Sequence, residues 1–259
     1  TAVQATLNAA KAAGGGRVYL PTGTYLVDGL SLADADYITI CGDGPGRTIL
    51  RMVPGASAAP VLQFIRCNHL TVTDLEIDGD KANQTSKYIR GLQWLADAAA
   101  SGGVLCEHGT FERLYIHDTT DQGLNVAGGR WAKIHAVHTE RCGSTGNIGA
   151  GIHISHAYPD TTIHSCDVQI SDCSDDGSGL DEGDEGAGLQ MQVGTSRITV
   201  TNYISRNAKK YGVKCQAHKV ELNNIQVYEP GVAGIALQYN DVRASNLRIE
   251  KTTAGSAGA

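Results

Sequence analysis

The chain has 259 residues, of which 41% are hydrophobic, 19% charged and 5% aromatic, with 32 glycines and only 6 prolines. This composition is typical of a globular protein and excludes collagen, a coiled coil and a disordered tail. The 21 basic residues are outnumbered by 27 acidic ones, for a net charge of −6. No Lys/Arg-rich run could follow a phosphate backbone, so we expect no nucleic-acid partner.

No stretch approaches the roughly 18 uninterrupted apolar residues of a membrane span, and the opening TAVQATLNAA lacks the parts of a signal peptide. We therefore expect no membrane span. The 7 cysteines are widely spaced and form no C-x-x-C pair. We expect mostly free thiols that pack as small apolar groups.

The first residues predict a short amphipathic helix. Val3, Leu7 and Ala10 fall on one helical stripe, and three glycines at 14–16 end it before the strand-like RVYLP. Such a helix would cover the open end of a stack of strands. We divide the single expected domain into a capping helix, first coils, a loop insertion, repeat coils and a flexible end, at residues 1–13, 14–79, 80–103, 104–251 and 252–259.

The second half contains a repeat. Five segments read Gly, apolar, variable, apolar, and they begin at Gly123, Gly151, Gly188, Gly212 and Gly234. A second register repeats every 22 residues, at Asn202, Asn224 and Asn246. The segments alternate with period two and are rich in Val, Ile and Leu, which indicates strands. A unit of this length predicts a solenoid whose strands pair in parallel with their equivalents in the next turn.

The runs AVQATLNAAKAAGGGRVYLPTGTYLV, ITICGDGPGRTIL and LTVTDLEIDGDKAN resemble the amino-terminal half of pectate-lyase-like β-helix proteins. That superfamily includes phage tailspikes, tail-associated depolymerases, polysaccharide lyases and alginate epimerases. The resemblance implies an all-β fold, a right-handed parallel β-helix with a short N-terminal capping helix. It also implies that the chain is part of a longer one, since these families carry an acidic segment before the helix. Spikes of this fold are commonly trimeric, so a homotrimer or a larger virion assembly is expected.

Alternation predicts that every second residue of the repeat strands points outward. One outward row is Asn125, His153, Gln190, Lys214 and Ala236, and a second is Ala127, Ser155, Gln192, Gln216 and Gln238. Amides and hydroxyls on a rigid sheet suit a polyhydroxylated chain, so we predict that Asn125, Ser155, Gln190, Gln192, Gln216 and Gln238 bind a polysaccharide. The alternative is a solvated sheet face without a ligand.

Two catalytic routes are open. β-Elimination needs a base for the C5 proton and a group that neutralises the carboxylate. His153 and Lys214 are the candidates, because they lie two repeat steps, or about 10 Å, apart on one row. His156 is a substitute, and Tyr211 and Arg206 could assist. The alternative for His153 is an ordinary surface histidine.

Hydrolysis needs two carboxylates. The insertion at 174–187 supplies six, at Asp175, Asp176, Asp181, Glu182, Asp184 and Glu185. Asp172, Ser174 and Asp176, followed by Gly177, also resemble the start of a calcium loop, although the twelfth position is Gly183 rather than Glu. We therefore expect either a solvated loop or a Ca²⁺ site, and no other cofactor.

The sequence departs from two catalytic patterns of the superfamily. In alginate epimerases the segment equivalent to DQGLNVAGG resembles Tyr-Gly-Phe-Asp-Pro-His, whereas here those positions are Gln122, Asn125 and Ala127. The polygalacturonase Asp-Asp and Gly-His-Gly set is also missing. The resemblance thus implies the fold without the epimerase chemistry. Trp94 and Trp131 could each stack on a sugar ring, but we expect both to be buried.

The leading prediction is a phage tail or tailspike-type protein, in the virion or extracellular, that binds and, if catalytic, depolymerises a bacterial surface polysaccharide. A secreted polysaccharide lyase or related carbohydrate-active enzyme is the first alternative. A structural or adhesive β-helix module without catalysis is the second.

Overall fold

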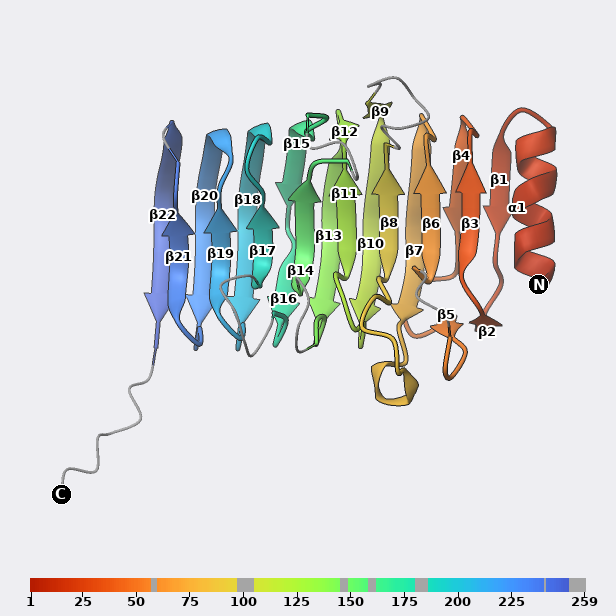
Figure 1. The fold of residues 1–259 in the computed structure, drawn as a ribbon, viewed down its shortest axis with the longest axis horizontal. Helices are drawn as coiled ribbons and strands as arrows, with labels where there is room; N and C mark the ends of the chain where they lie inside the picture. Colours follow the sequence, from red (N-terminus) through yellow and green to blue (C-terminus); the bar gives the residue numbers. More distant parts are fainter. Residues whose placement is uncertain are drawn as a thin grey trace.

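The computed structural model describes residues 1–56, 60–96, 105–144, 149–157, 162–179, 186–239 and 241–251. The chain winds into a stack of coils, with helix α1 (Ala2–Ala12) at one end and strand β22 (Val242–Glu250) at the other (Figure 1). Every ladder between the described strands is parallel, and the described residues form two sheets. The structure confirms the parallel β-helix with an N-terminal helix.

The smaller sheet, sheet B, has eight strands and takes one strand from each coil. Its members are β3 (Leu30–Ala33), β6 (Leu62–Ile65), β8 (Leu92–Leu95), β11 (Leu124–Ala127), β14 (Ala150–Ser155), β17 (Ala187–Met191), β19 (Tyr211–Cys215) and β21 (Ala233–Leu237).

The larger sheet, sheet A, has fourteen strands and wraps around the rest of each coil. Its members are β1 (Gly16–Tyr19), β2 (Gly23–Val27), β4 (Ile38–Cys41), β5 (Thr48–Met52), β7 (Leu70–Asp78), β9 (Cys106–Glu107), β10 (Gly109–His117), β12 (Gly129–Arg130), β13 (Lys133–Glu140), β15 (Cys166–Ser171), β16 (Ser174–Asp176), β18 (Ser196–Arg206), β20 (His218–Tyr228) and β22.

The chain bends at left-handed residues that recur at equivalent positions of successive coils. One set, which we call the corner residues, lies at or just before the start of sheet A strands with φ between 51° and 67°: Tyr37, His69, His108, Trp131, Asp167, Arg197, Lys219 and Asp241. A second set lies further along, within a long strand or, for Asp172, between β15 and β16, with φ between 49° and 58°: Asp74, Arg113, Ala136, Asp172, Asn202, Asn224 and Asn246. The bends divide each coil into straight strands that face different directions. Asn202, Asn224 and Asn246 all lie at such bends, which explains why asparagine repeats every 22 residues.

The repeat glycines form a column in which the backbones of neighbouring coils touch. A Cβ atom at Gly123 would lie 2.7 Å from the carbonyl oxygen of Gly151, and one at Gly212 would lie 2.8 Å from that of Gly234. Real Cβ atoms essentially never approach so closely. The repeat therefore requires glycine because a side chain would push the coils apart.

Helix α1 packs on the first coil. It buries Val3 and Leu7, as the helical stripe predicts. The Gln4 side chain mimics a neighbouring strand: its Nε2 donates to the Ser31 carbonyl at 2.8 Å, and its Oε1 accepts from the Ser31 amide at 3.0 Å. The helix thus satisfies backbone groups at the edge of sheet B.

A single hydrophobic core runs between the sheets and contains the inward residues of both. Trp94 is fully buried in it and donates a hydrogen bond to the Cys67 carbonyl at 2.8 Å. All seven cysteines are buried and free, as predicted. Trp131, by contrast, is 43% exposed, so the expectation that it is buried is wrong.

The assignment of residues 80–103 to a loop insertion is also wrong in part. The short helix η1 (Lys81–Asn83) and β8 both fall within it, and β8 is an internal strand of sheet B. Residues 97–104 and the expected flexible end at 252–259 lie outside the described residues. Within the part of the chain that the structure describes, no helix is long and apolar enough for a bilayer.

Candidate functional site

Six polar side chains from six neighbouring strands of sheet B form what we call the central row: Gln63, Gln93, Asn125, His153, Gln190 and Lys214. The strand register places each residue beside the next. Their sequence neighbours, such as Leu124 and Val126, are fully buried in the core, so the row points away from it. The sequence predicted the last four members. Gln63 and Gln93 were missed, although Gly91-Leu92-Gln93-Trp94 follows the repeat pattern that would have identified Gln93.

The middle of the central row is buried, contrary to the expectation of an open sheet face. Asn125 is 5% exposed, His153 3%, Gln190 0% and Lys214 3%. The adjacent Ser155 is buried as well. Solvent reaches the second predicted row further along the stack, where Gln192 and Gln216 are half-buried and Gln238 is exposed.

A chain of hydrogen bonds fixes the side chains around His153. The Arg90 Nε donates to Gln122 Oε1 at 2.6 Å, and the same oxygen accepts from Asn125 Nδ2 at 2.9 Å. A guanidinium can only donate hydrogen bonds, so the Gln122 side-chain amide must point its oxygen toward Arg90. That oxygen in turn fixes Asn125 with its NH₂ group toward Gln122.

The orientation of Asn125 determines the tautomer of His153. Asn125 Nδ2 also lies 3.5 Å from His153 Nδ1, a long contact that favours Nδ1 as the acceptor. We therefore assign the proton of the neutral ring to Nε2, a buried atom that has no hydrogen-bond partner among the described residues. Unpaired buried donors are costly and rare, so this atom is a candidate contact for a ligand oxygen.

The charged groups that lower the pKa of His153 are positive. Burial, followed by Arg90, His156 and Lys214, lowers the pKa of His153 to about 3, so the ring is neutral at physiological pH. Arg90 forms an ion pair with the fully buried Asp121 at 2.8 Å, and its own side chain is 28% exposed. Arg90 is therefore the point at which this network meets solvent.

The three assisting residues that the sequence suggested are placed differently. Tyr211 is near the row, because the Lys214 Nζ lies 5.7 Å from the centroid of its ring. His156 contacts His164 edge to face at 6.1 Å, and burial lowers its pKa. Arg206 lies on sheet A, over the ring of Tyr228, so it belongs to another face of the coil.

The predicted calcium loop is not a loop where the structure describes it. Ser174 and Asp176 belong to strand β16, which pairs on both sides. Asp172 accepts from Asn202 at 2.8 Å, and Asp176 accepts from Asn207 at 2.8 Å. The Ser174 hydroxyl lies 2.8 Å from His138 Nδ1. Neighbouring strands thus engage each of the three in a separate hydrogen bond.

The carboxylates suggested for hydrolysis do not form a described pair. Asp175 points inward, is fully buried, and accepts from the Thr139 hydroxyl at 2.8 Å. Burial raises its pKa to about 7. Asp176 lies on the opposite face of the same strand. Asp181, Glu182, Asp184 and Glu185 lie outside the described residues.

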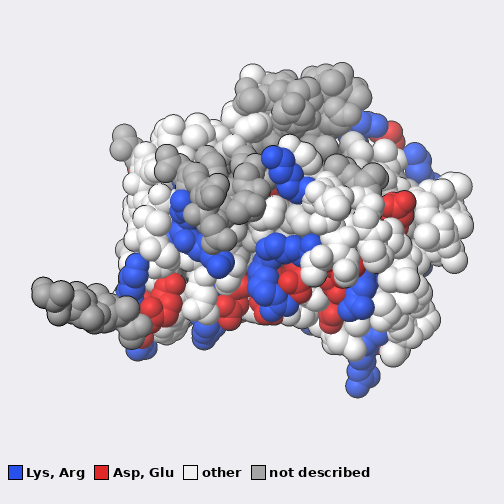
Figure 2. Space-filling view, turned by 60° about the horizontal axis from the view of Figure 1, so that its bottom comes forward, with Lys and Arg blue, Asp and Glu red and all other residues white. Residues whose placement is uncertain are grey.

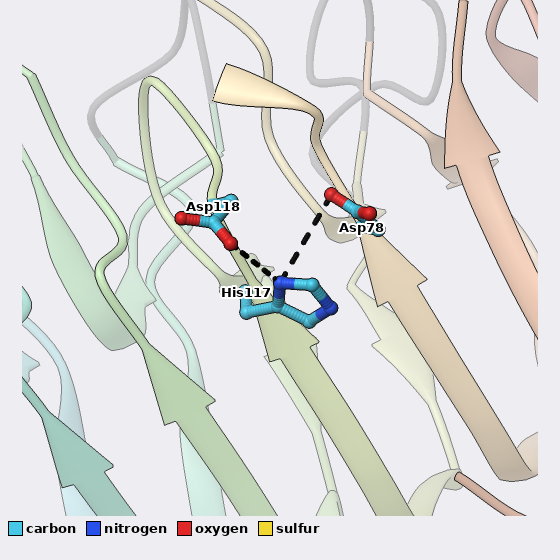
Figure 3. A group of neighbouring side chains, drawn as sticks. All are labelled: Asp78, His117 and Asp118. Atoms are coloured by element: carbon cyan, nitrogen blue, oxygen red, sulfur yellow. Dashed lines mark hydrogen bonds and ion pairs between the residues drawn. The ribbon is translucent and has the colours of Figure 1, made fainter. Parts of the chain in front are cut away.

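On sheet A, the described residues contain one cluster with metal-ligand chemistry, formed by Asp78, His117 and Asp118 (Figure 3). His117 Nδ1 lies 2.8 Å from Asp118 and 4.0 Å from Asp78. Arginines already compensate the carboxylates: Arg51 contacts Asp78 at 2.7 Å, and Arg141 holds the pKa of Asp118 at about 2. We interpret the cluster as an ion-pair network between coils.

No family model matches the chain. Mannuronan C5-epimerase AlgE6 of Azotobacter vinelandii is 31% identical over 136 residues, which cover 48% of this chain and 15% of that protein. Alginate lyase 7 of the same organism is 33% identical over 93 residues, or 32% of this chain and 11% of the lyase. The chain thus spans a small part of these relatives, which by name act on polysaccharides.

Among solved structures, the enzymatically active domain of bacteriophage CBA120 tailspike protein 2 superposes with a TM-score of 0.59 at 11% identity. The superposition covers 96% of this chain and 40% of the tailspike domain. Such a likeness shows the fold. The coils of this chain are those of a right-handed parallel β-helix.

Proposed function

We propose that this pectate-lyase-like right-handed β-helix binds an acidic bacterial polysaccharide, of mannuronan type, through the central row. The observation that carries the proposal is the buried, neutral His153, whose Nε2 has no hydrogen-bond partner among the described residues. The cations Lys214 and Arg90 act on this ring, and Asp121 already pairs with Arg90. Mannuronan is the substrate named for the relative AlgE6. We further propose a phage tail context, virion-borne or extracellular and trimeric, which the tailspike fold supports.

A uronate carboxylate could supply the hydrogen-bond acceptor that His153 Nε2 lacks among the described residues. Its oxygens accept hydrogen bonds, so one of them would satisfy the Nε2 proton of His153. Its negative charge would offset the neighbouring cations in a site from which water is largely excluded. Gln190, Asn125 and Ser155 would contact sugar hydroxyls. Arg90 is partly exposed, so an anionic ligand would approach the central row from the side on which Arg90 lies.

A second candidate function is turnover of the same ligand, which the sequence similarity to an epimerase and a lyase favours. Removal of the C5 proton places charge on the adjacent carboxylate, where donors and cations stabilise it. In this assignment His153 and Lys214 act on the carboxylate. His153 is a poor base, because its pKa of about 3 and its bonded Nδ1 leave it without a basic lone pair. Tyr211, beside Lys214, is then the candidate for moving the proton.

Calorimetric titration with a mannuronan hexamer tests binding. We expect His153→Phe, which keeps a ring but removes the donor, and Lys214→Met, which keeps the chain length but removes the charge, to weaken binding roughly tenfold or more each. Arg248→Met, which removes an exposed cation from strand β22 on sheet A, is the matched control and should bind like the wild type. Unchanged affinity in both row variants would contradict the proposal.

Incubation with polymeric mannuronan separates the remaining alternatives. Absorbance of an unsaturated product indicates a lyase, new guluronate signals in the proton NMR spectrum indicate an epimerase, and binding without either indicates a recognition or adhesive module. Light scattering gives the oligomeric state of the same preparation.

A further inference from the structure

A groove of about 870 Å³ lies on sheet A, away from the central row. The corner residues from His108 to Asp241 line it, together with the outward residues two positions further along each strand, from Thr110 to Arg243. It therefore crosses six successive coils, and at the usual strand spacing it is roughly 24 Å long. No residue of the central row lines it.

An aromatic side chain stands at one end of the groove. The corner residues Tyr37, His69, His108 and Trp131 stack along the helix axis, with ring centroids 4.6, 4.6 and 4.8 Å apart. The aromatic stack ends at Trp131, because the next corner residue is the much smaller Asp167. Trp131 is 43% exposed and lines the groove. The Arg130 guanidinium carbon lies 4.0 Å from the centroid of the Trp131 ring and covers part of the indole. The change from aromatic to small corner residues leaves the rest of the ring exposed to the groove.

The groove is rich in polar groups but nearly balanced in charge. Its lining includes four cationic side chains, Lys133, Arg197, Lys219 and Arg243, and three carboxylates, Asp167, Glu221 and Asp241. Arg197 and Asp167 pair in a two-pronged contact at 2.5 and 2.8 Å. Gln169 and Thr199 add uncharged donors and acceptors at neighbouring positions.

We infer that this groove is a second glycan-binding site, for a neutral oligosaccharide, with Trp131 as its stacking platform. The apolar face of a hexose ring packs on indole, and the alternating donors and acceptors match its hydroxyl groups. A charged polymer gains little from a groove whose own charges nearly cancel. The site is independent of the proposed function, because it uses other residues on another sheet.

Tryptophan fluorescence tests the inference directly. The chain has 2 tryptophans. Since Trp94 is fully buried, quenching by acrylamide reports on Trp131. The probes are maltohexaose, cellohexaose and laminarihexaose, with the mannuronan hexamer as the charged comparison. We expect at least one neutral hexamer to shift the emission to the blue and to protect Trp131 from acrylamide, with an affinity that hardly changes between 50 and 500 mM salt.

Two variants complete the test. Trp131→Asn removes the ring but keeps a residue that tolerates the left-handed corner, so it should weaken neutral-hexamer binding about tenfold or more. Tyr37→Asn makes the same change at an exposed corner outside the groove and should bind like the wild type. The inference is overturned if no neutral hexamer protects Trp131, if only mannuronan does, or if both variants bind equally. None of these outcomes depends on His153 or Lys214.

Discussion

At the level of single residues, burial shifts the pKa of two ionisable groups toward the neutral form, one pointing outward from sheet B and one pointing inward from sheet A. His153, which points outward, has a pKa lowered to about 3. Asp175, which points into the core, has a pKa raised to about 7. In each case desolvation is the largest cause. The first group faces the proposed ligand site, whereas the second affects only the stability of the fold.

Asp175 predicts a specific pH dependence of stability. The pKa of Asp175 in the folded protein exceeds its unfolded value of 3.8, so the fold favours the protonated carboxyl group. The stability that this preference contributes is fully present below about pH 3.8 and is lost as the pH rises through about 7. At and above neutral pH the loss is about 4 kcal/mol. Asp175→Asn keeps the acceptor for Thr139 and cannot ionise. We expect the free energy of unfolding of this variant, measured in urea, to exceed that of the wild type at pH 8 and to approach it at pH 4.

Asp176→Asn is the control for this measurement, because its side chain lies on the outer face of the same strand and accepts from Asn207. It should not show the gain at pH 8. Identical pH profiles for Asp175→Asn and the wild type would mean that Asp175 is not buried as described.

At the scale of elements, the bends in the long strands of sheet A depend on side chains that tolerate left-handed backbone. Asn224 has a φ of 54° and donates to Asn202 Oδ1 at 2.9 Å, while Asn202 donates to Asp172 at 2.8 Å. The bend positions are thus joined from coil to coil by side-chain amides. This arrangement keeps the bends of neighbouring coils aligned.

We expect Asn224→Ala to destabilise the protein by about 1–2 kcal/mol, because alanine is strained in the left-handed conformation and the hydrogen bond to Asn202 is lost. Asn224→Gly keeps the backbone freedom and should recover the conformational part of that loss. Urea denaturation of the three proteins measures the differences. Equal stability of the alanine and glycine variants would rule out backbone conformation as the reason for asparagine at this bend.

The elements also show what the sequence could and could not predict. The glycine and asparagine registers predicted the coil and which residues point outward, because both patterns arise from contacts that recur in every coil. The burial of His153 and Lys214 was not predictable, since alternation along a strand shows which way a side chain points and not how much of it is covered. Trp131 was assigned to the interior because tryptophan is usually buried, whereas its position at a left-handed corner turns the ring outward.

At the level of the whole molecule, ion pairs connect several neighbouring coils. Lys, Arg, Asp and Glu side chains lie interleaved in a band on one face (Figure 2). Arg113 pairs with Asp74 at 2.6 Å and Arg141 with Asp118 at 2.6 Å, each across one coil step. Such exposed pairs contribute little individually. Their effect is to place opposite charges side by side on neighbouring coils.

The proposed function requires that the central row holds a neutral histidine whose Nε2 proton is available to an anionic sugar. Nitrogen NMR of the His153 ring, with and without the mannuronan hexamer, measures this protonation state. We expect a neutral ring protonated at Nε2 throughout pH 5–8, and a shift of the Nε2 signals to those of a strong hydrogen bond when the hexamer is added. The proposal would be wrong if the His153 ring became protonated near pH 6.5 without ligand, or if its nitrogen signals did not change at saturating hexamer.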